Sequence, residues 1–293
     1  MKQTWLITVA KNAGYFYKKS METIIAGTDF SAPAQNAVNY AVELAKHFSA
    51  KLVLVNAYPV PTGGYDTVAP MEMMGALQES SIKALEELKQ EIIKSNYNFG
   101  IECVSHMGTP YAAIKNAASK FRGDLVVAGM VGEGSFLKRH IMGSVAINVA
   151  RNLEIPTFII PEAAKYEKIR NICFACDADK IEDGTVIYTA RDFAEVFGAE
   201  LELVSVDIPG KELIHEPRET RSFIERRLFG IKHTLVHIED ANVSTALEYY
   251  FKFHKADLVM LSPGKHRLLQ NLFTESVTKS LAYTLEIPML IVH

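Results

Sequence analysis

The sequence predicts an α/β protein that contains two copies of one doubly wound, parallel β-sheet domain. Three observations support this prediction. Segments in the two halves of the chain match in the same order. Short apolar runs alternate with stretches whose apolar residues recur every three to four positions, as expected for strands and amphipathic helices. The predicted strands, such as Leu125–Ala128, are continuous apolar runs, which is typical of parallel strands covered on both faces.

The composition fits a globular protein of this class. The 293 residues include 31 Lys and Arg against 34 Asp and Glu, which gives a formal net charge of -3, and 48% of them are hydrophobic. A chain of this length suggests two domains. The charge balance argues against a dedicated nucleic-acid-binding protein, and no apolar run is long enough for a membrane-spanning helix. Three cysteines are too few for a disulfide framework, so we expect a cytoplasmic protein.

Residues 1–20 are expected to form an extension outside the fold. Their apolar stretch, Trp5–Ala10, is shorter than the core of a secretory signal, and no small-residue cleavage pattern is evident. Met21 would be a natural start for the first domain.

Three pairs of segments define the repeat. Ala41–Tyr58 matches Ala190–Asp207, Asp124–Ala128 matches Asp257–Leu261, and Leu153–Ile160 matches Leu285–Val292. The offset is 149 positions for the first pair and 133 for the second, so the first copy contains about sixteen additional residues. We place them in the Gly- and Pro-rich stretch Pro59–Pro70, which is expected to be a loop. The domains are then residues 21–162 and 168–293, joined by a short polar linker.

The first copy alternates strands with helices. Ser31 is a suitable N-cap and Pro33 suits the first turn of a helix whose apolar residues follow at a period of 3.6. The other predicted helices are Ser80–Ser95, Pro110–Phe121 and Ser144–Leu153. The predicted strands are Thr23–Gly27, Leu52–Ala57, Phe99–His106, Leu125–Ala128 and Thr157–Ile160.

In open parallel sheets, ligands bind beyond the carboxyl ends of the strands, where the strand order reverses. Thr28 and Asp29 follow the first strand, and Ala57 and Tyr58 end the second. The fourth strand is followed by a glycine-containing segment, Gly129–Val145. Its glycines allow a ligand to approach the backbone closely, and the helix that begins near Gly143–Ser144 offers free N–H groups suited to phosphate.

With these motifs the sequence resembles the tandem type of the universal stress protein family. The segment TDFS after the first strand, the glycine segment and the closing Ile-Pro before the last strand of each copy carry the resemblance, which covers nearly all of residues 21–293. The resemblance implies a Rossmann-like fold similar to that of adenine nucleotide alpha hydrolases. It also implies a stress-response protein that binds ATP in its first domain, with Mg²⁺, and acts as a nucleotide-dependent sensor or regulator.

The residues that match the family's nucleotide site lie in two groups. The resemblance assigns Thr28, Asp29 and Ala57 to the nucleoside, and Gly129, Gly132, Gly143, Ser144 and Val145 to the phosphates. The family pattern G-x2-G-x9-G-[ST] is met with ten residues in place of nine between Gly132 and Gly143, so Gly134 is an alternative to Gly132. Lys138, Arg139 and His140 could neutralise phosphate or form a solvated turn.

The second copy departs from the glycine pattern. Ser262 stands where the first copy has Gly129, and Glu275 stands where it has Gly143. A carboxylate at the phosphate position would repel phosphate. Asp177 is retained after the first strand. We therefore expect the second domain not to bind ATP in the same way, and to pair with the first or bind something else.

The resemblance also implies assembly. The two domains are expected to pair about a pseudo-twofold axis through their last strands, Thr157–Ile160 and Met289–Val292, and two chains could associate further. The partner expected for the site is an adenine nucleotide, without nucleic acid or membrane.

No motif for a catalytic residue or a metal ligand is recognised, because the sequence has no nucleophile elbow, zinc-protease motif or Walker phosphate loop. Two alternatives to a nucleotide sensor therefore remain: an interaction protein that binds no nucleotide, and a slow ATP hydrolase.

Other residue groups have simpler explanations. Cys173 and Cys176 are expected to be core residues of a strand, where they point to opposite faces, although a redox or metal role is conceivable. His233 and His237 are also placed on a strand, which disfavours a zinc site, with or without His254 or His266. Met71, Met73 and Met74 could cover a ligand or form an interaction surface, but local packing is favoured.

Overall fold

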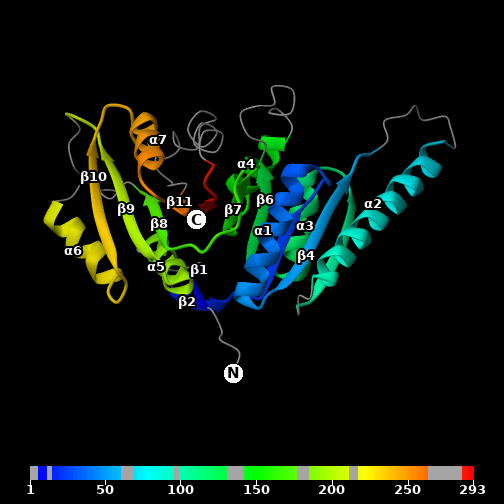
Figure 1. The fold of residues 1–293 in the computed structure, drawn as a ribbon, viewed down its shortest axis with the longest axis horizontal. Helices are drawn as coiled ribbons and strands as arrows, with labels where there is room; N and C mark the ends of the chain where they lie inside the picture. The colour runs from blue at the N-terminus through cyan, green and yellow to red at the C-terminus, as the bar shows by residue number, and fades with distance from the viewer. Residues whose placement is uncertain are drawn as a thin grey trace. The chain divides into compact units, whose positions relative to one another are not determined.

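The computed structural model describes residues 6–11, 15–60, 69–95, 99–130, 142–176, 185–210, 217–262 and 286–293 (Figure 1). Two compact units result from the contacts within the chain. We call residues Met21–Tyr166 the first unit, and Glu167–His293 together with Met1–Ser20 the second unit.

The first unit contains a parallel sheet with the strand order β7-β6-β3-β4-β5. Its strands are β3 (Thr23–Gly27), β4 (Lys51–Tyr58), β5 (Ile101–Met107), β6 (Leu125–Met130) and β7 (Thr157–Pro161). Its helices are α1 (Ala32–Phe48), α2 (Ala69–Lys94), α3 (Pro110–Phe121) and α4 (Met142–Asn152). The chain runs outward from β3 to β5 and then returns to β6 on the other side of β3. This is the reversal of strand order at which ligands bind in such sheets.

The strands β3, β4, β6 and β7 are mostly buried on both faces because helices cover both sides of the sheet, whereas the edge strand β5 is half-buried. Ile25, Val53 and Val126 belong to a buried cluster with α3 and with Val149 of α4. Ile24 and Leu54 alternate with these residues along their strands and are also fully buried. The predicted doubly wound α/β fold is therefore confirmed for this unit.

The helix ends follow the local sequence. Ser31 is the N-cap of α1 and its side chain accepts a hydrogen bond from the N–H of Ala34, while Thr109 caps α3 in the same way. The prediction for the start of α2 was wrong. It begins at Ala69, not at Ser80, so Pro70 lies in the first turn of a helix and not in a loop.

The second unit repeats this arrangement with the parallel strand order β10-β9-β8-β11-β12. Its strands are β8 (Asn171–Ala175), β9 (Glu200–Asp207), β10 (His233–Glu239), β11 (Leu258–Leu261) and β12 (Met289–Ile291). Its described helices are α5 (Thr185–Phe197), α6 (Pro217–Arg227) and α7 (Val243–Phe253).

Two equivalent aspartates make the same contacts in the two units. In the first unit, Asp124 Oδ2 accepts hydrogen bonds from the N–H groups of Glu22 and Thr23, at 2.8 and 3.0 Å. In the second unit, Asp257 Oδ2 accepts from Arg170 and Asn171, at 2.8 and 2.9 Å. Each aspartate directly precedes a strand, β6 or β11, and thus fixes the start of the neighbouring first strand of its own unit, β3 or β8.

Residues 1–20 were expected to lie outside the fold. They contain two antiparallel strands, β1 (Leu6–Lys11) and β2 (Tyr15–Ser20), which form a small sheet of their own. Strand β1 contacts α5, so this hairpin is associated with the second unit.

Candidate functional site

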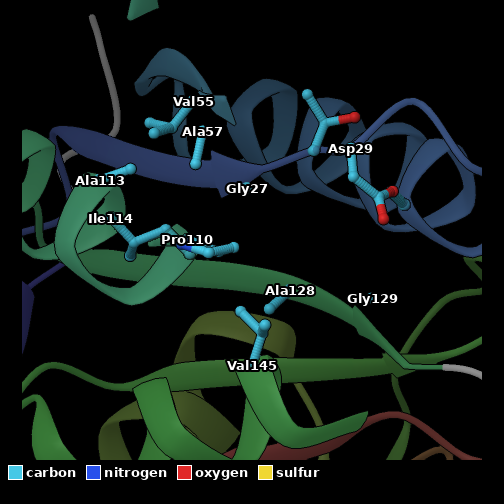
Figure 2. Close-up of a pocket in the computed structure, with 12 residues that line it drawn as sticks. Gly27, Asp29, Val55, Ala57, Pro110, Ala113, Ile114, Ala128, Gly129 and Val145 are labelled. Atoms are coloured by element: carbon cyan, nitrogen blue, oxygen red, sulfur yellow. The ribbon is translucent and has the colours of Figure 1, made fainter. Parts of the chain in front are cut away.

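A cavity of about 80 Å³ lies at the carboxyl ends of β3, β4 and β6, where the strand order of the first unit reverses (Figure 2). The first residues of α1, α3 and α4 complete its walls. It is lined by Gly27, Thr28, Asp29, Ala34, Val55, Ala57, Pro110, Ala113, Ile114, Ala128, Gly129 and Val145. The lining is mostly apolar, with the carboxylate of Asp29 as its only charged group among the described residues.

Five of the residues proposed from the sequence line this cavity: Thr28, Asp29, Ala57, Gly129 and Val145. Gly143 and Ser144 lie in the first turn of α4, beside Val145. Gly132 and its alternative Gly134 fall outside the described residues, as do Lys138, Arg139 and His140.

Sequence reasoning missed the wall that α3 provides. Pro110, Ala113 and Ile114 follow β5, whereas ligand-binding residues were sought only at the ends of the first, second and fourth strands. The signal was present, because Thr109–Pro110 is a helix start directly after a parallel strand. The same strand-end argument applied to β5 would have found it.

The loop that bears Asp29 is held by its own hydrogen bonds. Asp29 Oδ1 accepts from both the N–H and the hydroxyl of Ser31, at 3.0 and 2.6 Å. The hydroxyl of Thr28 accepts from the N–H of Phe30, at 3.0 Å. Phe30 has a φ of 63°, in the left-handed region that L-residues seldom adopt. These bonds stabilise that conformation and orient the Asp29 side chain at the entrance of α1.

A chain of polar side chains extends behind this loop. Asn56 donates to the carbonyl of Thr28 at 2.8 Å, and its own side-chain oxygen accepts from the hydroxyl of Ser81 at 2.6 Å. Ser105 donates to Ser81 at 2.7 Å. Asn56 and Ser81 are buried, so the network connects β5, α2, β4 and the Thr28 loop away from water.

Two glycines allow elements to approach each other around the cavity. A Cβ at Gly129 would lie 2.6 Å from the carbonyl oxygen of Pro33, and one at Gly27 would lie 2.9 Å from Cδ1 of Ile114. The Gly129 contact is with backbone of α1 and cannot be relieved by a side-chain rotation. The end of β6 therefore requires glycine for steric reasons, in addition to any contact with a ligand.

The two cysteines of the second unit's C-x2-C segment are buried, as expected for core residues. Cys173 lies in β8 and Cys176 follows that strand, and both are buried free thiols. Cys173 donates a hydrogen bond to Glu202 Oε2 at 3.2 Å. Burial, strengthened by this carboxylate, raises the pKa of the Cys173 thiol.

The histidines do not gather into a site among the residues that the structure describes. His233 and His237 lie on β10, where His237 contacts Asp207 at 3.3 Å and His233 contacts the carbonyl of Ile231 at 3.0 Å. His254 stacks on Tyr250, and His266 lies outside the described residues. No group of three His, Cys, Asp or Glu side chains in the described part of the chain could hold a metal ion.

Two of the three methionines near the start of α2 are exposed, contrary to the favoured expectation of local packing. Met71 and Met73 are 79% and 56% exposed, and Met74 is half-buried. Of the second unit's equivalent positions, the altered Ser262 is buried, whereas the altered Glu275 and the retained Asp177 lie outside the described residues. Within the described ranges, no helix has the length and apolar character needed to cross a membrane.

Comparison with known proteins finds similarity to the universal stress protein family in both a sequence profile and individual relatives. The sequence profile described as "Universal stress protein family" matches residues 21–161. A universal stress protein of Methanocaldococcus jannaschii is 28% identical over 169 residues, which cover 56% of this chain and 94% of the relative. A Staphylococcus haemolyticus protein named for the same family is 30% identical over 160 residues, covering 50% of this chain and 94% of the relative.

One solved structure extends the similarity to both units. A universal stress protein of Archaeoglobus fulgidus superposes with a TM-score of 0.67, covering 93% of this chain and 96% of its own. At 17% sequence identity this similarity supports the fold alone.

Proposed function

The chain belongs to the universal stress protein family, and from this membership we propose that its first unit binds ATP as part of a nucleotide-dependent regulatory role in a stress response. The observation that carries the proposal is the cavity at the strand reversal. It brings together the Thr28–Asp29 loop, the end of β4 and the start of α4, three segments that lie far apart in the sequence.

The nucleoside would bind at the apolar end of the cavity. The small residues Ala57, Ala113 and Ala128 leave space for a flat ring system. Oδ1 of Asp29 accepts the hydrogen bonds from Ser31. Because the Asp29 carboxylate lies at the cavity, it is suited to accept a hydrogen bond from a sugar hydroxyl or an adenine amino group as well. Thr28 supports this position through its backbone bonds to Val55 and Asn56.

The phosphates would lie toward α4. The first turn of a helix offers unpaired N–H groups and a positive dipole end, and Val145 in this turn lines the cavity. Gly129, Gly132, Gly143, Ser144 and Val145 are the residues we assign to this end.

Mg²⁺ fits the site only as an ion that arrives with the nucleotide. Asp29 is the single carboxylate among the described residues that line the cavity, and Mg²⁺ commonly combines one or two carboxylates with phosphate oxygens and water. When bound, the ion would neutralise phosphate charge. We propose no hydrolytic role for any residue of this chain.

We propose that the second unit binds no ATP in this manner. Its counterpart of Gly129 is the buried Ser262, which carries a side chain where the first unit has glycine in close contact with the backbone of α1. The three cysteines are free thiols, which suits the reducing cytoplasm that we expect for this protein.

Isothermal titration calorimetry with ATP and Mg²⁺ tests the proposal. Wild type should bind saturably, and Asp29→Asn should weaken binding at least tenfold because it removes the charge but retains an acceptor oxygen. Asp240→Asn is the matched control, since Asp240 Oδ1 accepts from the N–H of the N-cap residue Asn242 at 2.7 Å, as Asp29 does for Ser31. Identical binding curves for wild type and Asp29→Asn would contradict the site assignment.

Two further measurements separate the alternatives. Gly143→Glu places a carboxylate where the second copy has Glu275 and should abolish binding if phosphate lies there. An interaction protein that binds no nucleotide would give no heat with wild type. Chromatography of ADP released over hours tests slow hydrolysis, and mass spectrometry of small molecules released on denaturation tests for a nucleotide that co-purifies.

Assembly through the last strands of the two domains, and of two chains, stays a prediction. Light scattering coupled to gel filtration would measure whether the chain is a monomer of 32.6 kDa or a dimer.

A further inference from the structure

A second cavity, of about 280 Å³, lies between α1 and α2 of the first unit, and we call it the α1–α2 groove. It contains two carboxylates, Glu43 and Glu91, and the side chain of Tyr166. The rings of Tyr40 and Tyr166 meet edge to face at 4.9 Å. Among the described residues that line the groove there is no lysine or arginine. Lys46 lies 3.8 Å from Glu43, but its side chain is 63% exposed and this is a loose surface contact.

The same place in the second unit can be identified residue by residue. The repeat offset of 149 makes Asn39, Val42 and Glu43 of α1 equivalent to Tyr188, Arg191 and Asp192 of α5. For α2 and α6, the buried residues Ile92 and Ile224 each lie nine positions before the next strand. This alignment makes Ser95 equivalent to Arg227.

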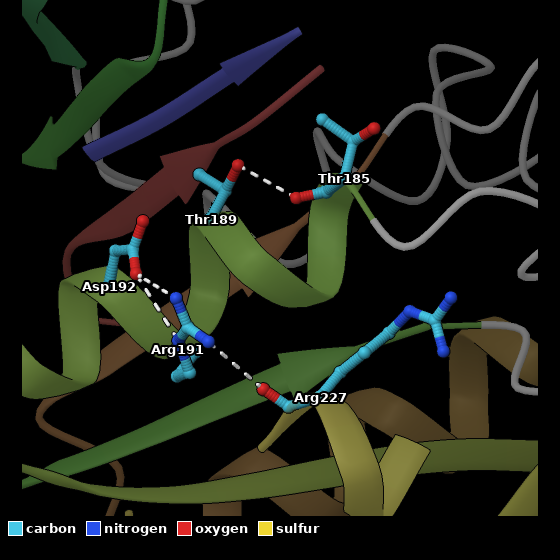
Figure 3. Close-up of polar contacts among 5 residues, drawn as sticks. All are labelled: Thr185, Thr189, Arg191, Asp192 and Arg227. Carbon is cyan, nitrogen blue, oxygen red and sulfur yellow. Dashed lines mark hydrogen bonds and ion pairs between the residues drawn. The ribbon is translucent and has the colours of Figure 1, made fainter. Parts of the chain in front are cut away.

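In the second unit, a guanidinium group of the chain itself occupies this place. Arg191 Nε and Nη2 donate to Asp192 Oδ1 at 3.3 and 2.9 Å, and Nη1 donates to the carbonyl of Arg227 at 3.5 Å (Figure 3). The Arg191 guanidinium lies 5.1 Å from the ring centre of Tyr188, and that of Arg227 lies 5.7 Å from it. Asp192 is fully buried, so its charge is paired where water does not reach.

The first unit retains the carboxylate and an aromatic ring but lacks both arginines. Glu43 replaces Asp192, and Tyr166, in the segment after β7, supplies a ring. Burial, followed by the charge of Glu43, raises the pKa of Tyr166. Val42 and Ser95 are too short to fill the space that arginines fill in the second unit.

We propose that the α1–α2 groove binds a guanidinium group from outside the chain. Glu43 would accept its N–H groups as Asp192 accepts those of Arg191, and the side-chain oxygen of Asn36 offers a further acceptor. Asn39 Oδ1, which accepts from Gln35 Nε2 at 3.2 Å, has a second lone pair. A planar guanidinium suits a carboxylate beside an aromatic ring better than a compact ammonium does.

Titration of the ¹⁵N-labelled full chain with agmatine, followed by amide chemical shifts, tests this proposal. We expect saturable shifts in α1 and α2. Glu43→Gln should weaken binding at least tenfold, whereas Glu86→Gln, which removes an exposed α2 carboxylate outside the groove, should leave it unchanged. Val42→Arg should also abolish agmatine binding, because it supplies from the chain the guanidinium that the second unit has.

Two further ligands test whether the groove requires the positive charge of the guanidinium and which kind of molecule supplies it. The neutral urea analogue of agmatine should not bind. Agmatine and a blocked Gly-Arg-Gly peptide both carry the guanidinium. Tighter binding of agmatine would identify a free small molecule as the source of the guanidinium, and tighter binding of the peptide would identify an arginine side chain. The proposal is overturned if agmatine gives no saturable shift below about 10 mM, or if Glu43→Gln binds it as wild type does. ATP titration of Glu43→Gln serves as an independent check, since this groove is separate from the nucleotide cavity.

Discussion

The side-chain amide of Asn56, at the end of β4, donates a hydrogen bond to the backbone carbonyl of Thr28, at the end of β3, over 2.8 Å. Together with the backbone bond from the Thr28 N–H to the Val55 carbonyl, this contact joins the two strand ends that carry the nucleoside side of the proposed site. It is buried, and the Asn56 side-chain oxygen is used at the same time by Ser81. The position of the Asp29 loop thus depends on residues that do not line the cavity.

Asn56→Ala should therefore both destabilise the first unit and weaken nucleotide binding. It leaves the Thr28 carbonyl and the Ser81 hydroxyl without this partner in a buried place, which costs about 1–3 kcal/mol in the free energy of unfolding. Urea denaturation and ATP titration measure the two effects. Ser105→Ala removes only the last, half-buried hydroxyl of the network and should have a smaller effect on both. Equal effects of the two variants would argue against Asn56 as the residue that positions the loop.

Gly129→Ala should close the contact between β6 and α1. The new Cβ would lie 2.6 Å from the Pro33 carbonyl oxygen, so the backbone must shift, at a cost of about 1–3 kcal/mol. Thermal unfolding and ATP titration should both show a loss. Gly75→Ala is the matched control, because a Cβ there meets nothing within 4 Å and alanine stabilises a helix by about 0.5–1 kcal/mol relative to glycine. A higher melting temperature for Gly129→Ala would refute the steric argument.

Asp124→Ala and Asp257→Ala should destabilise their own units by similar amounts. Each substitution removes one carboxylate oxygen that accepts two backbone N–H groups, which predicts a loss of about 1–3 kcal/mol. Hydrogen exchange followed by mass spectrometry can assign the loss of protection to β3 or to β8. Equal deprotection of both strands in either variant would contradict separate, equivalent roles.

Elements with strong local signals could be predicted well from the sequence. The bounds of β3 and α3 agree with the predicted Thr23–Gly27 and Pro110–Phe121, because a cap, a proline or a bounded apolar run defines each end. The start of α2 was missed because Pro70 and the nearby glycines suggested a loop, although proline is acceptable in a first helical turn.

The site could be predicted only where it depends on strand ends. Asp29, Ala57 and Gly129 follow from the rule that ligands bind at the carboxyl ends of parallel strands. The Asn56–Ser81–Ser105 network could not be predicted, because its members come from three elements and no spacing in the sequence relates them. The α1–α2 groove is defined by the difference between the two units, since Val42 and Ser95 carry no local signal for a site.

From the hydrogen-bonded residues Cys173, Glu202 and Tyr250, we predict that the second unit loses stability at high pH. The carboxylate of Glu202 accepts hydrogen bonds from the thiol of Cys173 and the hydroxyl of Tyr250. The equivalent residues of the first unit are Ile25, Val53 and Ala117, all in its apolar cluster. Burial, followed by the hydrogen bond to this carboxylate, raises the pKa of both Cys173 and Tyr250 in the folded state.

The direction of the pH dependence follows from these raised pKa values. The folded state holds both protons more tightly than the unfolded chain, whose thiol and phenol release them near about pH 8.5 and 10. The stabilisation is therefore complete below about pH 8 and declines as the pH rises above that value. For each group, the total loss in the free energy of unfolding is about 1.4 kcal/mol per unit of difference between its folded and unfolded pKa. Urea denaturation of wild type between about pH 7 and 11 should show this decline. Tyr250→Phe should flatten it, whereas Tyr249→Phe, at an exposed position of the same helix, should not. A pH profile that Tyr250→Phe leaves unchanged would mean that the folded state does not hold the Tyr250 proton in this way.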